Sequence, residues 1–191
     1  MILKRLLSFG IAAVLVVLAL TAVVWWEGRV EHRYDTQIRA AAQRYGVDPA
    51  LVKAVVWNES HFKAHARGSK GEIGLMQLQE LAAQEWADAE RIRTFDHEHC
   101  IDPGTNTLAG THYLAKLLRR YTHTDDPVPY ALADYNAGRS NALKWMTGAA
   151  ATNSAAFIEQ IGFPSTKNYV KVIMERAARY KPEFQSRADR Q

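Results

Sequence analysis

The feature that most limits how this chain can fold is the apolar run from Leu6 to Trp26, which contains no ionisable residue. A transmembrane helix needs roughly 20 consecutive apolar residues, so the run is long enough to span a bilayer. Lys4 and Arg5 precede it. Because basic residues tend to stay on the cytoplasmic side of a membrane, the sequence predicts a single transmembrane helix at residues 6–26, with everything after Trp26 exported.

A cleaved signal peptide is the alternative interpretation of the same run. The run is long for the apolar part of a signal peptide, and the nearest small-residue site, Leu20–Thr21–Ala22, lacks a small residue at its first position. No cysteine lies near the end of the run, so lipid attachment at that point is excluded. These observations favour an uncleaved anchor.

The exported part of the chain has the size of one domain. Cys100 is the only cysteine, so no intrachain disulfide can form. The formal net charge is +4 and the pI is about 9.2, but no basic cluster accompanies this charge, so nucleic acid is not an expected partner. A cytoplasmic DNA-binding protein would require the apolar run to be something other than a membrane segment.

Helix signals dominate after residue 35. Asp48–Pro49 and Asp102–Pro103 each combine a helix N-cap with a first-turn proline, and no alternating pattern of strand length appears. The fold class is therefore predicted to be mainly α. The predicted helices cover residues 36–45, 49–60, 75–87, 103–121, 127–136, 140–146, 155–160 and 164–180, the last one stopped by Pro182. The predicted organisation is a cytoplasmic tip (1–5), a membrane anchor (6–26), a stalk (27–35), a helical domain (36–182) and a polar tail (183–191).

One acidic residue falls on the apolar face of a predicted helix. Glu59 follows Val52, Val55 and Val56 at helical spacing, which places a carboxylate at the edge of the core. Burial and the negative end of the helix dipole both favour its neutral form, so Glu59 is a candidate general acid. The alternative is a core-edge glutamate paired with a lysine or arginine, and this helix considered alone favours that alternative.

Three motifs follow one another along the chain: Glu59–Ser60 with Gly71–Gln77, then Ala133–Gly138, then Ile161–Val170. Together, in this order and at this separation, they resemble the catalytic domain of bacterial lytic transglycosylases, the glycoside hydrolase family 23 group related to goose-type lysozyme. The resemblance covers about residues 38–180. It implies a lysozyme-like multi-helix domain.

The resemblance also implies roles for individual residues. It assigns the catalytic carboxylate to Glu59, places Gln77 facing a sugar cleft and puts Tyr135 close to Glu59. The substrate-binding residues that it implies are Ser60, Gly74, Leu75, Met76, Gln77, Tyr135, Asn136 and Tyr169. Local interpretations remain beside these roles: Asn136 can serve as a helix cap, Met76 can serve in packing, and Tyr169 fits the core as well as the cleft.

The chain departs from the family pattern at several positions. Gly68 stands where a serine is frequent, Gln79 where methionine or threonine is usual, and Asp134 where a small residue precedes the tyrosine. The late motif has Gly162, Ser165 and Lys167 in place of the usual proline, glutamate and arginine. These changes concern substrate contacts, because the residues implied for the chemistry itself are in place.

Glycosidic cleavage usually uses two carboxylates, and Asp134, beside Tyr135, is the nearest candidate for a second one. The resemblance implies a mechanism with a single carboxylate instead. Glu59 would protonate the bridging oxygen between N-acetylmuramic acid and N-acetylglucosamine, and the N-acetyl group would help to stabilise the cation. Glu59 would then take a proton from the muramyl 6-hydroxyl, which closes a 1,6-anhydro ring without consuming water.

No metal or cofactor is expected. The potential ligands in Asp96–Cys100 are too closely spaced for a usual zinc site, so a polar loop is predicted there, and the chain contains no calcium-loop motif. The expected substrate is the glycan strand of peptidoglycan, approached from the periplasmic side of the bacterial inner membrane. A hydrolytic muramidase and a non-catalytic wall-binding scaffold remain as alternatives, and any partner in the cell-envelope machinery is unknown.

Overall fold

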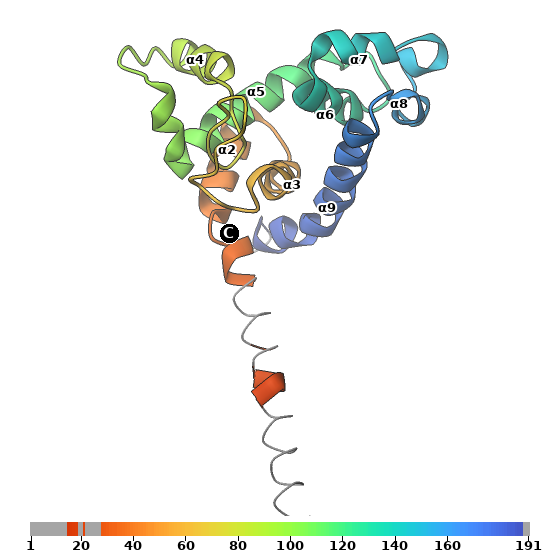
Figure 1. Ribbon diagram of the computed structural model, residues 1–191. Helices are drawn as coiled ribbons and strands as arrows, with labels where there is room; N and C mark the ends of the chain where they lie inside the picture. Colours follow the sequence, from red (N-terminus) through yellow and green to blue (C-terminus); the bar gives the residue numbers. More distant parts are fainter. Residues whose placement is uncertain (1–14, 19–20, 22–27, 189–191) are drawn as a thin grey trace, which may run out of the picture. The chain divides into compact units, whose positions relative to one another are not determined.

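The computed structural model describes residues 15–18, 21 and 28–188 (Figure 1). The chain divides into two units, Met1–Tyr34 and Asp35–Gln191. In the first unit the described residues up to 31 are helical. Most of the predicted membrane anchor lies outside the described residues. Among the helices that are described, none has both the length and the apolar composition needed to cross a membrane.

The second unit is built almost entirely of helices, as the sequence predicts. Its elements are α2 (Asp35–Tyr45), α3 (Pro49–Ser60), α4 (Glu80–Ala89), the 3-10 helix η1 (His97–Ile101), α5 (Pro103–Arg120), α6 (Pro127–Ala137), α7 (Arg139–Trp145), the 3-10 helix η2 (Gly148–Ala151), α8 (Ser154–Gln160) and α9 (Pro164–Ala188). Two isolated antiparallel bridges, Arg67 to Ile73 and Ile73 to Leu78, provide the β pairing found within residues 28–188.

Three of the long helices begin with the same device. The side chains of Asp48, Asp102 and Asp126 accept hydrogen bonds from the backbone N–H groups of the first turns of α3, α5 and α6. A proline occupies the first turn of each helix, where its missing N–H costs no hydrogen bond. Local sequence therefore determines where these three helices start.

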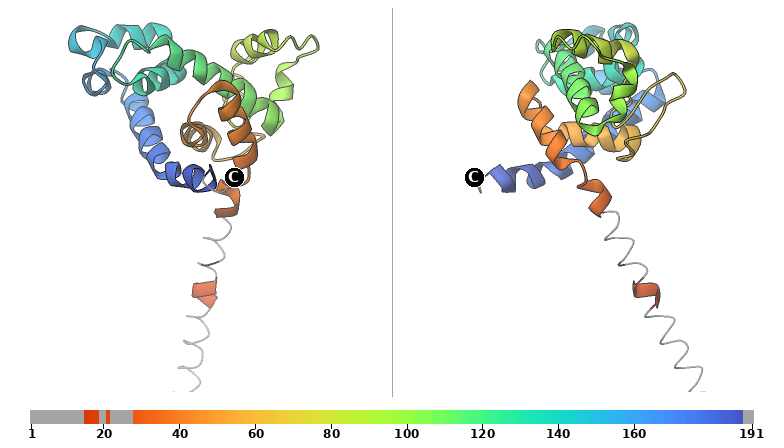
Figure 2. Two further views of the ribbon diagram at one scale, coloured as in Figure 1. Left: turned by 180° about the vertical axis from the view of Figure 1, so that it is seen from behind. Right: turned by 90° about the vertical axis from the view of Figure 1, so that its left-hand side faces the viewer.

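α3, α6 and α9 meet near the C-terminal end of α3. α3 packs along α9 and against α2, and α6 packs on α5, α7 and α9. α5 runs between the part of the domain that contains α4 and η1 and the part that contains α6 to α8 (Figures 1 and 2). Residues of α3, α6 and α9 thus converge on one region, although they are far apart in sequence.

The prediction of a helix over residues 75–87 is wrong at its start, because α4 begins only at Glu80. Residues 74–78 form a tight turn instead, in which Ile73 and Leu78 exchange two backbone hydrogen bonds of 3.0 Å. Leu75, Met76 and Leu78 are nevertheless buried. Their spacing resembles that of a helix because the turn inserts all three side chains into the core.

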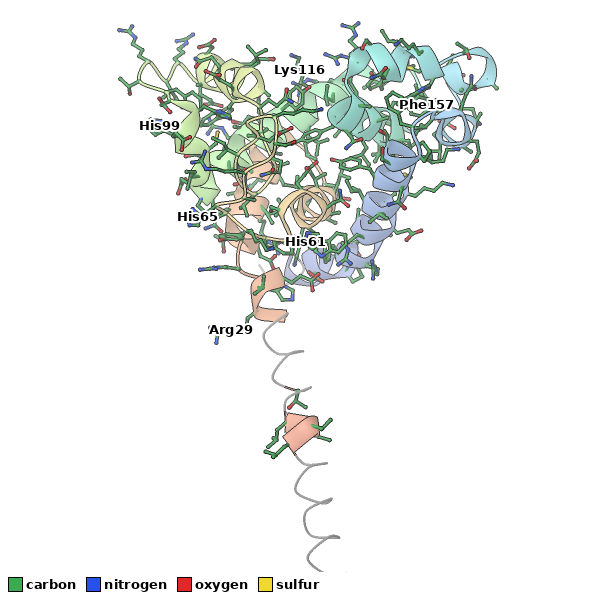
Figure 3. All side chains as sticks on the ribbon, in the orientation of Figure 1. Arg29, His61, His65, His99, Lys116 and Phe157 are labelled. Carbon is green, nitrogen blue, oxygen red and sulfur yellow. The ribbon has the colours of Figure 1, made fainter. Side chains whose placement is uncertain are left out.

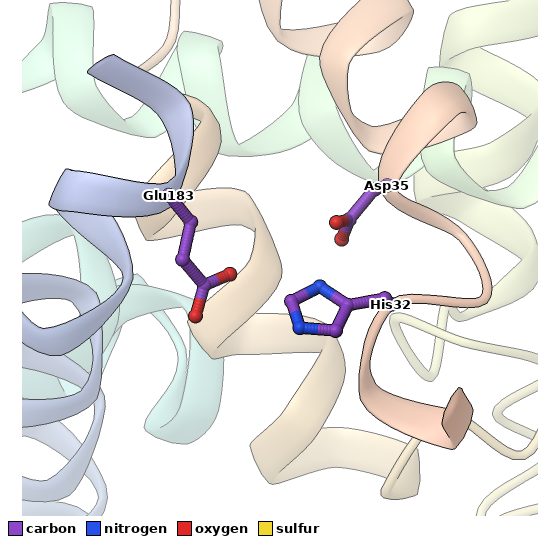
Figure 4. A group of neighbouring side chains, drawn as sticks. All are labelled: His32, Asp35 and Glu183. Atoms are coloured by element: carbon purple, nitrogen blue, oxygen red, sulfur yellow. The ribbon is translucent and has the colours of Figure 1, made fainter. Parts of the chain in front are cut away.

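The predicted stop at Pro182 is also wrong, because α9 continues through it to Ala188. The residues after the proline are held by tertiary contacts. Lys53 Nζ lies 2.7 Å from Glu183 Oε2 and 2.9 Å from Asp35 Oδ1, and Figure 4 shows the two carboxylates turned toward the same space. Phe184 is buried. These interactions offset the hydrogen bond that a proline removes from a helix.

Candidate active site

Glu59 occupies the last turn of α3, on the side of the helix that enters the core. Val52, Val55 and Val56 on the same face are fully buried, and Glu59 itself is only partly exposed. The helix ends at His61 (Figure 3), whose backbone is left-handed with φ 49°. The carboxylate therefore lies where its spacing predicts, at the boundary between the core and solvent.

A tyrosine from the last helix holds the Glu59 carboxylate. The hydroxyl of Tyr169, on α9, donates a hydrogen bond of 2.6 Å to Glu59 Oε1. Tyr169 is buried, and burial together with the nearby Glu59 charge raises the pKa of this tyrosine well above its usual value. Tyr169 is therefore a permanent hydrogen-bond donor that fixes one carboxylate oxygen and leaves the other available.

The surroundings of Glu59 raise its pKa from 4.5 to about 7. Burial is the largest cause, and the negative charge of Glu72 adds to it, whereas the hydrogen bond from Tyr169 opposes it. A carboxyl group with a pKa near 7 carries its proton in a large fraction of molecules at neutral pH. This is the state that a general acid needs before it meets its substrate.

Tyr135, on α6, lies near the same carboxylate but bonds elsewhere. Its hydroxyl donates a hydrogen bond of 2.7 Å to the backbone oxygen of Met76. Burial raises the pKa of Tyr135 well above its usual value, and the charge of Glu59 contributes to this increase. Tyr135 therefore connects α6 to the turn of residues 74–77 at a point within electrostatic reach of Glu59.

The turn of residues 74–77 is fixed from below by two buried polar side chains. The Ser60 hydroxyl donates a hydrogen bond of 2.8 Å to the backbone oxygen of Leu75. Asn106 on α5 accepts 2.8 Å from the Met76 N–H and donates 2.9 Å to the Ile73 oxygen. A Cβ atom at Gly74 would lie 2.2 Å from the Asn106 amide nitrogen. This position therefore requires glycine, both for the close approach and for its φ of 81°.

Asn106 is a residue that sequence reasoning missed. It is fully buried and hydrogen-bonded. The available signal was a polar side chain at helical spacing from Ala109 and Gly110 on the apolar face of α5. Such a residue is expected to satisfy buried backbone groups, which is what Asn106 does.

Gln77 lies in the turn with a left-handed backbone, φ 46°. Its amide nitrogen donates to the backbone oxygens of Ala66 (3.1 Å) and Gly74 (2.9 Å). The amide group is thereby fixed in orientation on the wall of a cleft. Because the nitrogen is already occupied by the backbone, the amide oxygen is the group that remains to accept a hydrogen bond.

A cleft with a volume of about 690 Å³ runs past these residues. One wall comes from residues 68–82 and from α5, and the other comes from α6 and the start of α7. Its lining includes Glu59, Gly68, Glu72, Gln77, Glu85, Tyr113, Lys116, Arg120, Asp134, Tyr135, Asn136 and Arg139. The late motif supports this wall, since the Thr166 hydroxyl donates 2.8 Å to the Asn136 side-chain oxygen. A cleft of this form suits an extended polar chain.

Asp134, the candidate for a second acid, is already paired. It is almost fully buried and forms an ion pair with Arg120. The Tyr121 hydroxyl donates a further hydrogen bond of 2.7 Å to the same Asp134 oxygen. A carboxylate committed to an arginine and a tyrosine is a structural group rather than a proton carrier.

A lysine that α5 contributes to the cleft is in an ion pair as well. Lys116 (Figure 3) lies 2.6 Å from Glu85 Oε2, so α4 and α5 are bridged along the cleft. Glu72 differs from Asp134 and Glu85, because none of the ion pairs formed by the described residues includes it. It is a carboxylate of the cleft that the sequence analysis did not single out.

The run Asp96–Cys100 is not a loop: Asp96 caps η1, which covers His97–Ile101, and forms a capping box with His99. His99 Nδ1 accepts a hydrogen bond of 3.1 Å from the Asp96 N–H, and a His97 ring nitrogen lies 2.9 Å from the Leu78 oxygen. Burial raises the pKa of the Cys100 thiol to about 12. The two histidines therefore stabilise η1 and its contact with the Leu78 backbone, and Cys100 is a core residue.

The residues predicted for the site fall into two groups. Glu59, Gln77, Tyr135 and Asn136 line the cleft, and Tyr169 bonds directly to Glu59. Ser60, Gly74, Leu75 and Met76 are buried beneath the cleft, where they shape the turn. Proximity to the cleft thus separates groups positioned to contact a ligand from groups that support them.

Comparison with known proteins agrees with this geometry. Residues 36–158 match the family described as the transglycosylase SLT domain. The chain therefore belongs to the transglycosylase SLT domain family. It is similar to the membrane-bound lytic murein transglycosylase F of Desulfosudis oleivorans (39% identical over 109 residues, covering 56% of this chain and 22% of the relative). It is also similar to the membrane-bound lytic murein transglycosylase C of Sodalis glossinidius (32% over 127 residues, 59% and 33%).

Solved structures show the same fold. The lytic transglycosylase Slt of Pseudomonas aeruginosa, as an inactive variant, superposes with a TM-score of 0.73 at 25% identity over 81% of this chain and 25% of the other. The 70-kDa soluble lytic transglycosylase of Escherichia coli superposes with a TM-score of 0.70 at 25% identity over 79% and 24%. The chain spans between about a fifth and a third of the length of these proteins.

Proposed function

We propose that this chain is a lytic transglycosylase that cleaves the β-1,4 bond between N-acetylmuramic acid and N-acetylglucosamine in peptidoglycan. The observation that carries the proposal is the sheltered Glu59 carboxyl, with its pKa near 7, held by Tyr169 at the edge of a long cleft. Membership of the SLT domain family and the names of the relatives, which are lytic murein transglycosylases, support it.

In the proposed reaction Glu59 acts first as an acid. Tyr169 fixes Oε1, so Oε2 carries the proton toward the bridging oxygen of the sugar chain. As that oxygen takes the proton, the bond from muramyl C1 to the bridging oxygen breaks, and the substrate N-acetyl oxygen stabilises the cation that develops. The leaving N-acetylglucosamine then departs with a free hydroxyl.

Glu59 then acts as a base. It takes the proton of the muramyl 6-hydroxyl, and the 6-oxygen bonds to C1, which gives a 1,6-anhydro ring. One C–O bond has broken and one has formed, the carboxyl is again protonated and no water is consumed. The Gln77 amide oxygen and Asn136 are the proposed sugar contacts, while Ser60, Gly74, Leu75 and Met76 hold the turn that carries Gln77.

Digestion of purified sacculi tests this function. Wild-type protein is expected to release fragments with anhydromuramyl ends, and the Glu59→Gln variant is expected to release none while it retains its helical circular dichroism. Loss of one general acid lowers a rate by about 10²–10⁴-fold. Reducing ends in the product mass spectrum would identify a hydrolytic muramidase, and binding without release would identify a wall-binding scaffold.

We also propose that the catalytic domain, residues 36–182, is tethered to the periplasmic face of the inner membrane by residues 6–26 through the stalk of residues 27–35. The length and charge flanks of the apolar run support this arrangement, as do relatives named membrane-bound. Full-length protein is then expected to stay with membranes after alkaline carbonate extraction. Release into the soluble fraction would contradict the anchor.

A further inference from the structure

Glu72 places a second carboxylate in the same cleft as Glu59. Both residues line the cleft and are partly exposed, but the Glu59 carboxyl is surrounded by more protein than that of Glu72. Glu72 Oε2 accepts a hydrogen bond of 2.9 Å from the Lys70 N–H. Partial burial acts to raise the pKa of Glu72, but hydrogen bonds from backbone N–H groups and the Gln79 side chain, together with the Lys70 charge, outweigh it and the pKa is lowered.

The space for this carboxylate exists because residue 68 has no side chain. A Cβ atom at Gly68 would lie 2.2 Å from Glu72 Oε2 and 3.0 Å from Gln77 Oε1. The Glu72 carboxylate therefore fills the volume that a side chain at position 68 would need, beside the fixed amide of Gln77. Because Gly68 has no side chain, there is room beside it for the charged side chain of Glu72.

Tyr169 and Glu72 act on the pKa of Glu59, and Tyr135 lies within electrostatic reach of the same carboxylate, each from a different element. Tyr169 approaches from α9 and Tyr135 from α6, and both are neutral phenols. Glu72 approaches from the loop after α3 and is negatively charged. When two carboxyl groups of one cleft have their pKa values shifted apart, the two groups take different roles in the chemistry.

We propose that Glu72 is a positioning carboxylate for this reaction: it stays ionised, keeps the Glu59 acid protonated until the bridging oxygen takes the proton, and stabilises the positive charge that develops at muramyl C1. This inference rests on the proposed function. Glu72 itself gains and loses no proton, so the anhydro product is the same with or without it. What changes is the rate and the pH range in which Glu59 works.

Two substitutions remove the negative charge from its position beside Gly68 and Gln77, one by neutralising Glu72 and the other by displacing it. Glu72→Gln keeps an oxygen that accepts from Lys70 but removes the charge. Gly68→Ala keeps the charge but displaces the flexible carboxylate with a methyl group. Glu175→Gln, an exposed site on α9 outside the cleft, removes one negative charge as the matched control. Steady-state kinetics on soluble glycan fragments, recorded across neutral pH, compare these variants and the double variant G68A/E72Q.

The proposal predicts that E72Q lowers kcat by roughly tenfold, since a nearby charge at a protein surface contributes on that scale, with little change in KM. The alkaline limb of its pH profile moves to lower pH, because Glu59 then loses its proton more readily. G68A also lowers kcat and moves the alkaline limb to lower pH. The kcat of the double variant is no lower than that of E72Q alone, because the two changes remove the same interaction. E175Q behaves as wild type.

Several results would overturn the proposal. One is an E72Q variant with wild-type kcat and an unmoved alkaline limb, and another is a variant in which only KM changes. A third is a switch from reducing ends in the wild type to anhydro ends in E72Q, because Glu72 would then be activating water. Melting temperatures show whether each variant is folded. If wild-type protein releases nothing from sacculi, the proposed function fails, whereas an active wild type with an equally active E72Q refutes only the role of Glu72.

Discussion

The hydroxyl of Tyr169 donates a 2.6 Å hydrogen bond to Glu59 Oε1 across 110 residues of sequence. This contact joins α3 to α9, the last helix of the domain, at the functional carboxylate. It stabilises the charged form of Glu59, whereas burial and Glu72 stabilise the neutral form. The pKa of about 7 is therefore a balance of opposing contributions, of which those of Tyr169 and Glu72 can be removed separately by substitution.

Replacing Tyr169 by phenylalanine tests one side of this balance. Without the hydroxyl, the pKa of Glu59 is expected to increase further, so the alkaline limb of the pH–rate profile moves to higher pH. Activity at the optimum is expected to decrease by roughly tenfold, because the carboxylate loses the hydrogen bond that orients it. Tyr45→Phe, which alters a tyrosine outside the cleft, is the control. A limb that moves to lower pH would contradict the assigned role.

Glu59→Gln is expected to stabilise the fold at neutral and alkaline pH. The folded-state pKa of about 7 exceeds the ordinary value of 4.5, so the folded protein binds more protons between these values. The contribution of Glu59 to the free energy of unfolding is then fully present below about pH 4.5 and is lost as the pH increases toward 7. Glutamine removes this loss, which corresponds to about 1–3 kcal/mol.

Denaturant unfolding of wild type and E59Q at low and at neutral pH measures this difference. The two proteins are expected to unfold together at about pH 4, where Glu59 is protonated, and to diverge near pH 8 with the variant more stable. Equal stability at both pH values would mean that the carboxyl is well solvated, and the proposed acid would then lose its physical basis.

Asp134→Asn is expected to affect stability more than chemistry. The substitution leaves Arg120 without its buried partner, and removing one member of a buried ion pair costs about 3–5 kcal/mol, with the partial exposure of Arg120 placing this case at the lower end. Folded molecules of the variant are expected to retain kcat. Tyr121→Phe, which removes the second hydrogen bond to Asp134, should give a smaller loss of stability. A folded Asp134→Asn protein without activity would restore Asp134 as a second acid.

Lys53→Met is expected to destabilise the domain by about 3 kcal/mol, because Lys53 is fully buried and the change removes its ammonium group from Asp35 and Glu183. Adding Asp35→Asn and Glu183→Gln should recover much of the loss, since these substitutions remove the carboxylate charges that the ammonium group balanced. Chemical denaturation of the single and triple variants measures both values. A single variant as stable as wild type would show that the ion pairs contribute nothing.

The parts of the fold that local chemistry determines could be predicted from the sequence. The capping aspartates and first-turn prolines locate α3, α5 and α6, and the spacing of Glu59 behind Val55 places its carboxylate at the core edge. The start of α4 could not be predicted. It depends on the turn before it, and that turn depends on hydrogen bonds from Ser60 and Asn106.

In the site, too, some features could be predicted from the sequence and others depend on tertiary contacts. Family resemblance pointed to Glu59 and Tyr169, and the structure brings the two together. The general need for two carboxylates in glycosidic cleavage pointed to Asp134 as a possible second acid, without revealing that Arg120 neutralises it. Glu72 escaped notice because its position depends on the missing side chain at Gly68, and such a vacancy is evident only when the loop is folded.

The helix that carries the acid is fastened to its neighbour at two places. In the first half of α3, Lys53 forms an ion pair with Glu183 of α9, and at the end of α3, Glu59 accepts a hydrogen bond from Tyr169 of α9. Two separated attachments hold α3 and α9 against each other, so the support on which Glu59 stands is braced at both ends. Any widening of the cleft to admit a glycan strand must then come from its walls, one of which includes the loop of residues 68–72.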